Sequence, residues 1–342
     1  MNALQGELVK RGLDCAIFMT NEDPNPNLFY FTGYKGAGFL VIPANGKAVL
    51  HVPSRDLSEA KLIKGLSLSS GKKLTESLAE FGINTKKVGV DFVNTSVTDF
   101  NMLKEKFGCE LFDISGFMDE LRAVKHTSEI RKIRKACKIT DKIIGKFVDN
   151  FSKFKTEQEA AAFLVYETRK LGCVESFEPI VATGANAAVP HHTPSGKMKA
   201  GFCVVDFGIK YEGYCSDVTR TFYFGKPTAE EQKNYYDLLK EQETAIGLVK
   251  PGKIIGELCV QAEKNLKQKL IHSLGHGLGI EVHEFPYVST SSKTVLKEGM
   301  VITIEPGEYI EGKYGIRIED DVLVTKKGSE VLSKFSKKLI CL

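Results

Sequence analysis

The sequence lacks the features that mark a membrane protein or a disulfide-stapled protein. No apolar stretch approaches the ~20 residues that a helix needs to span a bilayer. The opening residues, MNALQGELVKRG, carry charge and have no apolar core, so we expect no signal peptide. The eight cysteines are scattered and contain no C-x-x-C pair. This usage predicts reduced thiols in a cytoplasmic protein.

Charge of one sign is also scarce. The formal net charge is only +4 over 342 residues, and no long run of one sign occurs. The basic cluster RKIRKACK (131–138) repeats at helical spacing, which indicates a solvated helix face. We therefore expect neither a nucleic-acid partner nor a membrane partner. A kinase is excluded too, because the D-F-G triplet at 206–208 lacks the companion kinase motifs.

The composition is that of a globular protein, with 42% hydrophobic and 26% charged residues. A chain of this length is too long for one ordinary core, which predicts two domains. Strand-like runs bounded by Gly, Pro and Asn occupy residues 15–20, 38–44, 47–53 and 86–92. NEDPNPN (21–27) is expected to be a loop, because Asn-Pro pairs start turns. We predict a smaller N-terminal α/β domain over 1–122.

The character of the chain changes after this domain. One long amphipathic helix is predicted from Ser128 to Asn150, with Thr127 or Ser128 as its N-cap. Capping-box patterns at Thr156 and Thr228 begin two further helices. Strands are predicted near 202–208, 215–224, 300–305, 315–319 and 321–325. We therefore predict a second domain, of α+β class, over 123–342.

A weak internal repeat lies inside this second domain. MKAGFCVVDFG (198–208) resembles LKEGMVITIEPG (296–307), and each copy ends in an acid near a glycine. A hairpin follows each copy, and its return strand carries another acid. The four acids are Asp206, Asp217, Glu305 and Glu319. The repeat predicts a pseudo-symmetric domain whose two halves face each other.

Four carboxylates in core-like strands require partners, because an unpaired buried carboxylate is costly. SLGHGLGIEVHEFP (273–286) adds His276 and His283 between Gly-rich turns. Taken singly, each acid is more often an ion-pair partner and each histidine a satisfied core residue. Their joint occurrence favours a site for two divalent cations, with manganese, cobalt, iron or zinc as the metals suited to an oxygen-rich set.

At these residues the sequence resembles a known family. VVDFG, YEGYCSDVTRTF, GHGLGIEVHEFP, ITIEPGEY and GIRIEDD occur in the order found in the pita-bread metallopeptidases, in the aminopeptidase P and Xaa-Pro dipeptidase (prolidase) branch. NLFYFTGYKGAGFLV is similar to the N-terminal creatinase-like domain of that branch. The resemblance implies a pita-bread catalytic domain with pseudo-two-fold symmetry and a smaller N-terminal α/β domain.

The resemblance also implies the ligand set. The metal ligands of the family correspond to Asp206, Asp217, His276, Glu305 and Glu319, and every position holds the expected residue type. By the same resemblance, Asp217 and Glu319 bridge the two ions. Manganese or cobalt is the expected metal, with zinc or iron as alternatives.

The family likeness further assigns roles in hydrolysis of the Xaa-Pro bond by a metal-bridging water. Glu305 is expected to shuttle the proton, and His191 and His283 to contact the substrate and stabilise the tetrahedral intermediate. His191 is chosen over His192 because it directly follows Pro190. His272 and Arg317 complete the expected catalytic set, Arg317 as the group that orients carboxylates. Tyr309 occupies a family position that lies near the metals, and the alternative role, that of a packed aromatic residue, is equally open.

The resemblance also implies the substrates, peptides or dipeptides with proline at the second position, and a homodimer as the assembly. Archaeal-type prolidases carry a basic residue soon after the H-E-x-P tetrad, whereas here Tyr287 follows Pro286, which slightly favours an aminopeptidase over a dipeptidase. Three alternatives remain. They are a methionine aminopeptidase-like enzyme, a catalytically silent binding module on the same fold, and a creatinase-like hydrolase, which the intact ligand set disfavours.

Overall fold

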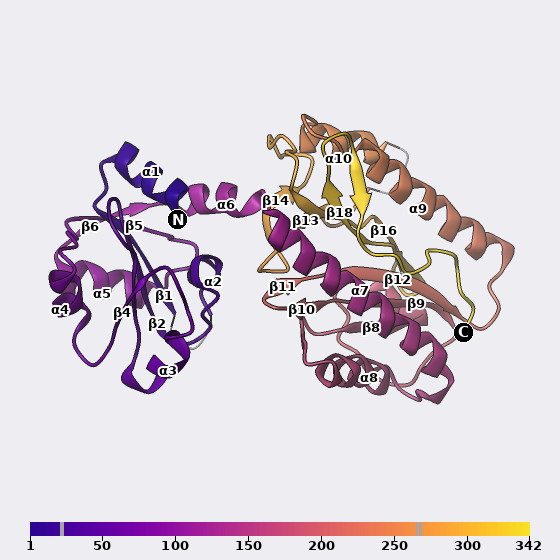
Figure 1. Ribbon diagram of the computed structural model, residues 1–342. Coiled ribbons are helices and arrows are strands. Elements are labelled where there is room, and N and C mark those ends of the chain that lie inside the picture. Colours follow the sequence, from indigo (N-terminus) through magenta and orange to yellow (C-terminus); the bar gives the residue numbers. More distant parts are fainter. Residues whose placement is uncertain (21–23, 265, 267–268) are drawn as a thin grey trace. The chain divides into compact units, whose positions relative to one another are not determined.

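The structure is a computed structural model that describes residues 1–20, 24–264, 266 and 269–342. The chain divides into two compact units, Met1–Leu121 and Arg122–Leu342 (Figure 1). None of the helices in the described ranges combines the length and the apolar character that a membrane span requires.

The N-terminal unit is built on a mixed six-stranded sheet in the order β4-β3-β2-β1-β5-β6. Its strands are β1 (Cys15–Thr20), β2 (Gly38–Pro43), β3 (Val49–His51), β4 (Ser67–Ser69), β5 (Lys87–Val90) and β6 (Glu110–Asp113). Strand β1 is antiparallel to β2 and parallel to β5. Side chains alternate along β1, so Phe18 joins one core and Ile17 the other. Burial on both faces explains its unbroken apolar run.

Short helices surround this sheet. They are α1 (Asn2–Arg11), α2 (Pro26–Thr32), α3 (Leu57–Ala60), α4 (Leu74–Glu80) and α5 (Val97–Phe107), with a 3₁₀ turn at Ser54–Asp56. Helix α6 (Ser115–Ala123) runs across the division between the units.

The loop predicted at 21–27 is only partly correct. Residues 21–23 lie outside the described part of the chain. Residues 26 and 27 are helical, because the Asn25 side chain caps α2 by accepting hydrogen bonds from the N–H groups of Asn27 and Leu28. Proline fits the first helical turn, where its missing N–H removes no hydrogen bond. An Asn-Pro pair here therefore begins a helix.

The first half of the C-terminal unit places two helices against a three-stranded antiparallel sheet, in the order β12-β9-β8 (Figure 1). These elements are α7 (Thr127–Asn150), α8 (Glu157–Lys170), β8 (Ile180–Thr183), β9 (Gly201–Phe207) and β12 (Val218–Phe224). Phe147 of α7, Leu164 of α8 and Val205 of β9 share one buried cluster. Helix α7 starts one residue before its predicted beginning, because His126 takes the cap position and donates its N–H to Glu129.

The second half repeats this plan. Helices α9 (Ala229–Leu248) and α10 (Ile255–Glu263) accompany a sheet of β13 (Gly275–Gly277), β14 (Glu284–Val288), β15 (Val301–Ile304), β18 (Asp320–Val324) and β19 (Ser329–Val331). Ile246 of α9, Leu258 of α10 and Ile302 of β15 share a second buried cluster. The two halves thus match the pseudo-symmetric arrangement that the sequence repeat predicts.

Short elements complete the unit. They are β7 (Val174–Glu175), β10 (Ile209–Tyr211), β11 (Tyr214–Cys215), β16 (Gly307–Ile310) and β17 (Tyr314–Arg317), with 3₁₀ turns at Phe151–Lys153 and Gly184–Ala188. Two predicted strands, 215–224 and 315–319, are interrupted at Asp217 and Glu319. The N–H of Asp217 bonds to the Asp321 carboxylate and that of Glu319 to the Thr219 carbonyl, across to the other half. The two acids thus stand where the hairpins of the two halves meet.

Candidate metal centre

The five residues predicted as metal ligands come from strand ends in both halves of the C-terminal unit. Asp206 is near the end of β9, Asp217 directly precedes β12, and His276 is the middle residue of β13. Glu305 directly follows β15, and Glu319 directly precedes β18. The placement is symmetric, with one acid at the end and one at the beginning of corresponding strands in each half.

All five side chains line one cavity of about 940 Å³. The remaining residues with predicted roles line it as well: His191, His272, His283 and Arg317. Apolar side chains form another part of the wall, among them Ala161 and Val165 of α8 and Phe177. The structure therefore brings the whole predicted set into one place.

Two possible ligand triads share one carboxylate. Oxygen atoms of Asp206, Asp217 and Glu319 lie within 4.8 Å of one another. Ligand atoms of His276, Glu305 and Glu319 do so as well. His276 Nε2 is 3.6 Å from Asp217 Oδ2 and 3.4 Å from Glu305 Oε1. Because Glu319 belongs to both triads, the arrangement has room for two cations joined by a common ligand.

Three of these carboxylates each keep one buried oxygen that has no protein partner in the described part of the chain. Among the described residues, no hydrogen-bond partner exists for the buried atoms Asp206 Oδ1, Asp217 Oδ1 and Glu319 Oε1. Burial raises the pKa of Asp217 well above its ordinary value, and the Glu319 charge adds to the effect. Burial and the Glu305 charge do the same to the pKa of Glu319. Divalent cations at these oxygens would offset the repulsion, so the donor set fits a pair of metal ions.

In the triad of His276, Glu305 and Glu319, the histidine has the protonation state that a metal ligand requires. Burial lowers the pKa of His276 to about 4, so its ring is neutral near pH 7. Its Nδ1 is 3.1 Å from the carbonyl oxygen of Gly277, which favours the tautomer with the proton on Nδ1. Nε2, which faces Asp217 and Glu305, is then left with a free lone pair. Burial also raises the pKa of Glu305 to about 8, although Arg317 acts in the opposite direction.

Arg317 restrains two of the candidate carboxylate ligands, Asp206 directly and Glu319 through Thr219. Its Nη2 donates to Asp206 Oδ2 at 2.7 Å and its Nε to the Thr219 hydroxyl at 3.2 Å. That hydroxyl in turn donates to Glu319 Oε2 at 2.7 Å. Arg317 therefore contacts one predicted ligand directly and another through a threonine that sequence reasoning missed.

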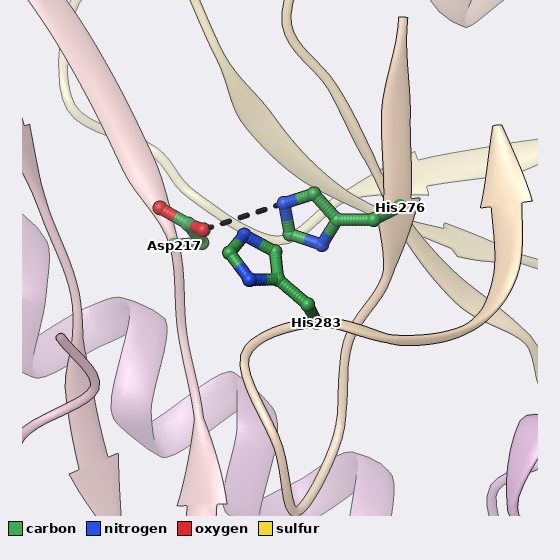
Figure 2. Close-up of side chains that lie close together, drawn as sticks. All are labelled: Asp217, His276 and His283. Carbon is green, nitrogen blue, oxygen red and sulfur yellow. Dashed lines mark ion pairs between the residues drawn. The ribbon is translucent and has the colours of Figure 1, made fainter. Parts of the chain in front are cut away.

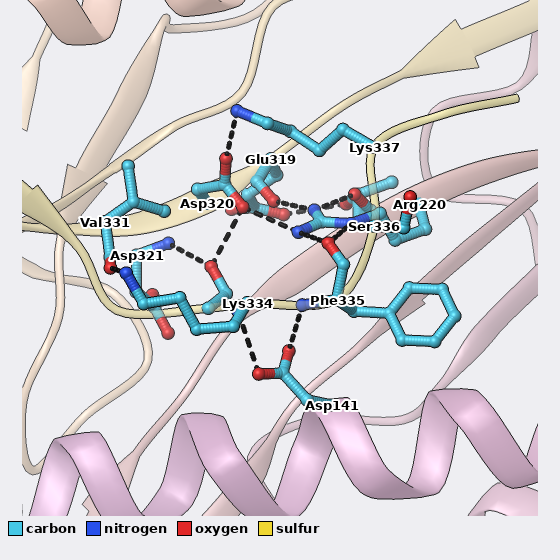
Figure 3. Close-up of polar contacts among 12 residues, drawn as sticks. Asp141, Arg220, Glu319, Asp320, Asp321, Val331, Lys334, Phe335, Ser336 and Lys337 are labelled. Atoms are coloured by element: carbon cyan, nitrogen blue, oxygen red, sulfur yellow. Dashed lines mark hydrogen bonds and ion pairs between the residues drawn. The ribbon is translucent and has the colours of Figure 1, made fainter.

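Three consecutive acids, Glu319 and the first two residues of β18, make three different contacts. Glu319 faces the cavity, whereas Asp320 accepts from Arg220 Nη2 at 2.7 Å and pairs with Lys337 Nζ at 3.0 Å (Figure 3). Asp321 accepts the N–H of Asp217 at 3.0 Å. Arg220 also donates to the main-chain oxygen of Glu319. The backbone on both sides of the ligand is thereby fixed.

Two further histidines lie beside the ligands. Figure 2 shows His283, from the loop before β14, directed at the same point as His276 and Asp217, and these three form a third group of possible ligands. The rings of His276 and His283 are 4.4 Å apart, centroid to centroid, and nearly perpendicular. His272 Nε2 lies 3.0 Å from the Tyr309 hydroxyl, which accepts a hydrogen bond from Arg317 at 2.7 Å. Burial lowers the pKa of both His272 and His283.

The neighbouring histidines of PHHTP have different surroundings. His191 is exposed along the cavity wall, whereas His192 Nε2 is 2.8 Å from the carboxylate of Glu157. Glu157 is fully buried at the start of α8. Sequence reasoning missed it, because a glutamate in the first turn of a helix is normally a solvent-exposed residue that favours the helix dipole.

Comparison with known families agrees with this geometry. Residues 131–326 match metallopeptidase family M24, and residues 1–124 match the creatinase/prolidase N-terminal domain. An Xaa-Pro dipeptidase of Pyrococcus furiosus is 36% identical over 325 residues, with 92% of each chain covered. An uncharacterized peptidase of Staphylococcus saprophyticus is 38% identical over 326 residues, which cover 91% of this chain and 93% of the relative.

Solved structures are similar over the same length. The prolidase of Pyrococcus horikoshii matches with a TM-score of 0.90 and 34% identity, covering 98% of each chain. The X-Pro aminopeptidase of Thermotoga maritima matches with a TM-score of 0.91 and 32% identity, covering 99% of this chain and 100% of that one. These findings confirm the predicted fold, a pita-bread domain with a creatinase-like N-terminal domain. The chain belongs to metallopeptidase family M24, in the aminopeptidase P and prolidase branch.

Proposed function

We propose that this protein is a dinuclear-metal exopeptidase that hydrolyses the Xaa-Pro bond at the N-terminus of peptides or dipeptides. The observation that carries the proposal is the pair of ligand triads sharing Glu319 at the wall of a cavity. Family membership supports it, as do relatives named Xaa-Pro dipeptidase and X-Pro aminopeptidase.

The proposed ligands are Asp206, Asp217, His276, Glu305 and Glu319. Cations bound there would polarise the scissile carbonyl and lower the pKa of the attacking water. An oxygen-rich set with one histidine favours manganese or cobalt over a thiolate-type zinc site, with zinc or iron as alternatives.

The protein's own groups move the proton and stabilise charge. Hydrolysis breaks the carbonyl carbon–nitrogen bond, and the water that adds to the carbon gives up a proton that ends on the proline nitrogen. Glu305 lines the cavity beside the other proposed ligands, and its carboxylate would accept that proton and pass it on. His283 and His191 stand at the cavity wall, where their ring N–H groups can donate to the oxyanion. Arg317 holds Asp206 in position.

The cavity wall favours substrates that extend beyond the proline. Among the described residues that line it, Arg317 is the sole arginine or lysine, and its guanidinium is already bonded to Asp206. Glu178 adds a negative charge to the lining, and Tyr287, which also lines the cavity, is exposed. Among the described lining residues, a free dipeptide carboxylate therefore finds no unengaged arginine or lysine, whereas a peptide bond after proline requires none.

The alternatives are less well supported. A methionine aminopeptidase-like enzyme would prefer Met-Gly peptides over Xaa-Pro peptides, and the relatives named above bear Xaa-Pro names. A silent binding module would be expected to have lost ligands, and all five positions are filled. The cytoplasmic location and the homodimer stay predictions, the latter to be checked by light scattering of the full chain.

The test is hydrolysis of Xaa-Pro, Xaa-Pro-Xaa and Met-Gly-Xaa after chelation and reloading with manganese, cobalt or zinc. We expect metal-restored release of the residue before proline, with faster turnover of the tripeptide than of the dipeptide. The Asp217→Asn variant is the matched control, because it keeps the side-chain shape and removes one ligand charge. Binding of two ions without cleavage of any Xaa-Pro substrate would refute the proposal.

A further inference from the structure

His191 lies in a short segment whose two ends are hydrogen-bonded to the rest of the C-terminal unit. The segment runs from Thr183, the last residue of β8, through the 3₁₀ turn Gly184–Ala188 to Ser195. This stretch contains no strand or helix of its own after Ala188. A loop without secondary structure keeps a side chain such as His191 in one position only if hydrogen bonds to its polar groups restrain the loop.

Glu157 supplies one anchor. Its Oε1 accepts from the N–H and the hydroxyl of Thr183, both at 2.7 Å, before His191 in the sequence. Its Oε2 accepts from the N–H of Ser195 at 3.0 Å and lies 2.8 Å from His192 Nε2, after His191. The Asn186 amide donates to both oxygens at 3.1 Å. One carboxylate therefore ties the two ends of the segment together.

The second anchor comes from the metal centre. Arg317 Nη1 donates to the main-chain oxygen of Pro190 at 3.2 Å, and Nη2 of the same guanidinium holds Asp206 at 2.7 Å. His191 thus stands between a residue bonded to Arg317 and a residue bonded to Glu157. Its backbone is restrained on both sides while its side chain remains on the cavity wall.

Glu157 is unusual for a residue in the first turn of a helix. Its side chain is 0% exposed, and burial alone would raise its pKa. The hydrogen bonds from Ser195 and Thr183 outweigh burial and hold the pKa below its ordinary value. The carboxylate is therefore charged and fully occupied by the segment, and it contacts none of the predicted ligands.

We propose that Glu157 is a positioning residue for the reaction: its buried carboxylate clamps the segment from Thr183 to Ser195 so that His191 is presented to the substrate. This inference rests on the proposed function for the role of His191. Glu157 itself is not among the described residues that line the cavity.

The test is a double-mutant cycle between Glu157 and His191 in the metal-loaded full chain. Glu157→Gln places an amide N–H₂ among donor groups, so the segment should shift, and a displacement of about 1 Å can lower the rate about 100-fold. We expect kcat/KM for an Xaa-Pro-Xaa peptide to fall about 10- to 100-fold in the otherwise unchanged enzyme. In the His191→Ala background the same change should cost less than about 2-fold, because its effect passes through His191.

A matched control lies on the same helix. Glu167 is 5% exposed, ten residues further along α8, and pairs with Lys170 at 3.4 Å and with Lys146 instead of the segment. Glu167→Gln should change kcat/KM by less than about 2-fold in both backgrounds. His192→Leu removes one hydrogen bond from Glu157 and should lower kcat/KM by a smaller factor than Glu157→Gln. This smaller fall should also disappear in the His191→Ala background. His192→Leu serves as the milder variant if Glu157→Gln does not fold.

A readout independent of turnover separates this inference from the proposed function. In histidine-labelled protein, the His191 ring signal should shift or broaden in Glu157→Gln and stay unchanged in Glu167→Gln. An equal loss of kcat/KM with and without His191, or an unchanged His191 signal, would overturn the positioning role. Absence of Xaa-Pro cleavage by the unmodified enzyme would instead refute the proposed function, and the ring signal would still decide the role of Glu157.

Discussion

In the metal-free protein, Glu305→Gln should increase stability at neutral pH while it removes activity. Burial raises the pKa of Glu305 from its ordinary value of 4.5 to about 8. Such a carboxyl holds its proton more tightly in the folded protein than in the unfolded chain. It therefore destabilises the fold once the pH exceeds the unfolded value, and glutamine, which never ionises, escapes this penalty.

The magnitude follows from the shift. Each pKa unit corresponds to about 1.4 kcal/mol, so the penalty is about 3 kcal/mol at pH 7 and levels off near 5 kcal/mol above pH 8. It is absent below about pH 4.5. For a unit of this size, 3 kcal/mol corresponds to a rise of roughly 6–12 °C in unfolding temperature. The neighbouring Thr303 hydroxyl, 3.4 Å from Glu305 Oε1, can still donate to the glutamine oxygen.

The assay is thermal unfolding in a chelator from pH 4.5 to 8.5, with Glu298→Gln as the control at an exposed position near β15. Manganese at about 100 times its dissociation constant should stabilise the unmodified protein by about 2.7 kcal/mol and Glu305→Gln by less. A variant that is no more stable at pH 7, or a stability difference that does not change with pH, would refute the account of buried repulsion.

Three further outcomes are expected. Glu319→Gln, which alters the ligand common to both triads, should abolish the thermal stabilisation by manganese and lower proline-peptide hydrolysis at least about 1000-fold, measured by calorimetry and a release assay. His283→Gln should lower kcat about 100-fold with a much smaller change in KM, because a donor to the oxyanion acts in the transition state; a change confined to KM would contradict this. Gly279→Ala would bring a methyl group within 2.3 Å of the Glu284 carboxylate, which pairs with Lys125 at 2.9 Å. The unfolding free energy of this variant should fall by about 2–3 kcal/mol in urea titration. An unchanged midpoint would contradict this, because it would mean that the loop moves to accommodate the methyl group without cost.

The candidate ligands could be predicted from sequence because each acid interrupts a run that otherwise belongs in a core. Asp217 and Glu319 follow this rule most clearly, since each sits where a β-run breaks before its return strand. Glycines around His276 add a second signal, because a Cβ at Gly275 would meet the Thr303 carbonyl oxygen at 2.0 Å. The acids and the glycines are visible in the sequence, whereas the close approach of Thr303 that requires Gly275 is visible only in the structure.

Other residues of the site gave no such signal. Glu157 reads as an ordinary acid at a helix start, and its partners follow 26 to 38 positions later. Thr219 reads as one more β-branched residue in a strand, yet it relays Arg317 to Glu319. Asp320 and Asp321 read as continuations of the acidic motif, although neither lines the cavity and they face Arg220 and Asp217.

The sequence by itself determined the two-domain organisation, the strand and helix types and the repeated hairpins. These properties follow from local patterns, since periodicity, capping residues and breakers act over a few positions. Only the tertiary structure decided which carboxylates stay unpartnered, which are neutralised by arginine or lysine, and which anchor a loop. Those outcomes depend on charges brought together from distant parts of the chain, because burial strengthens each pairing only after the fold has excluded water.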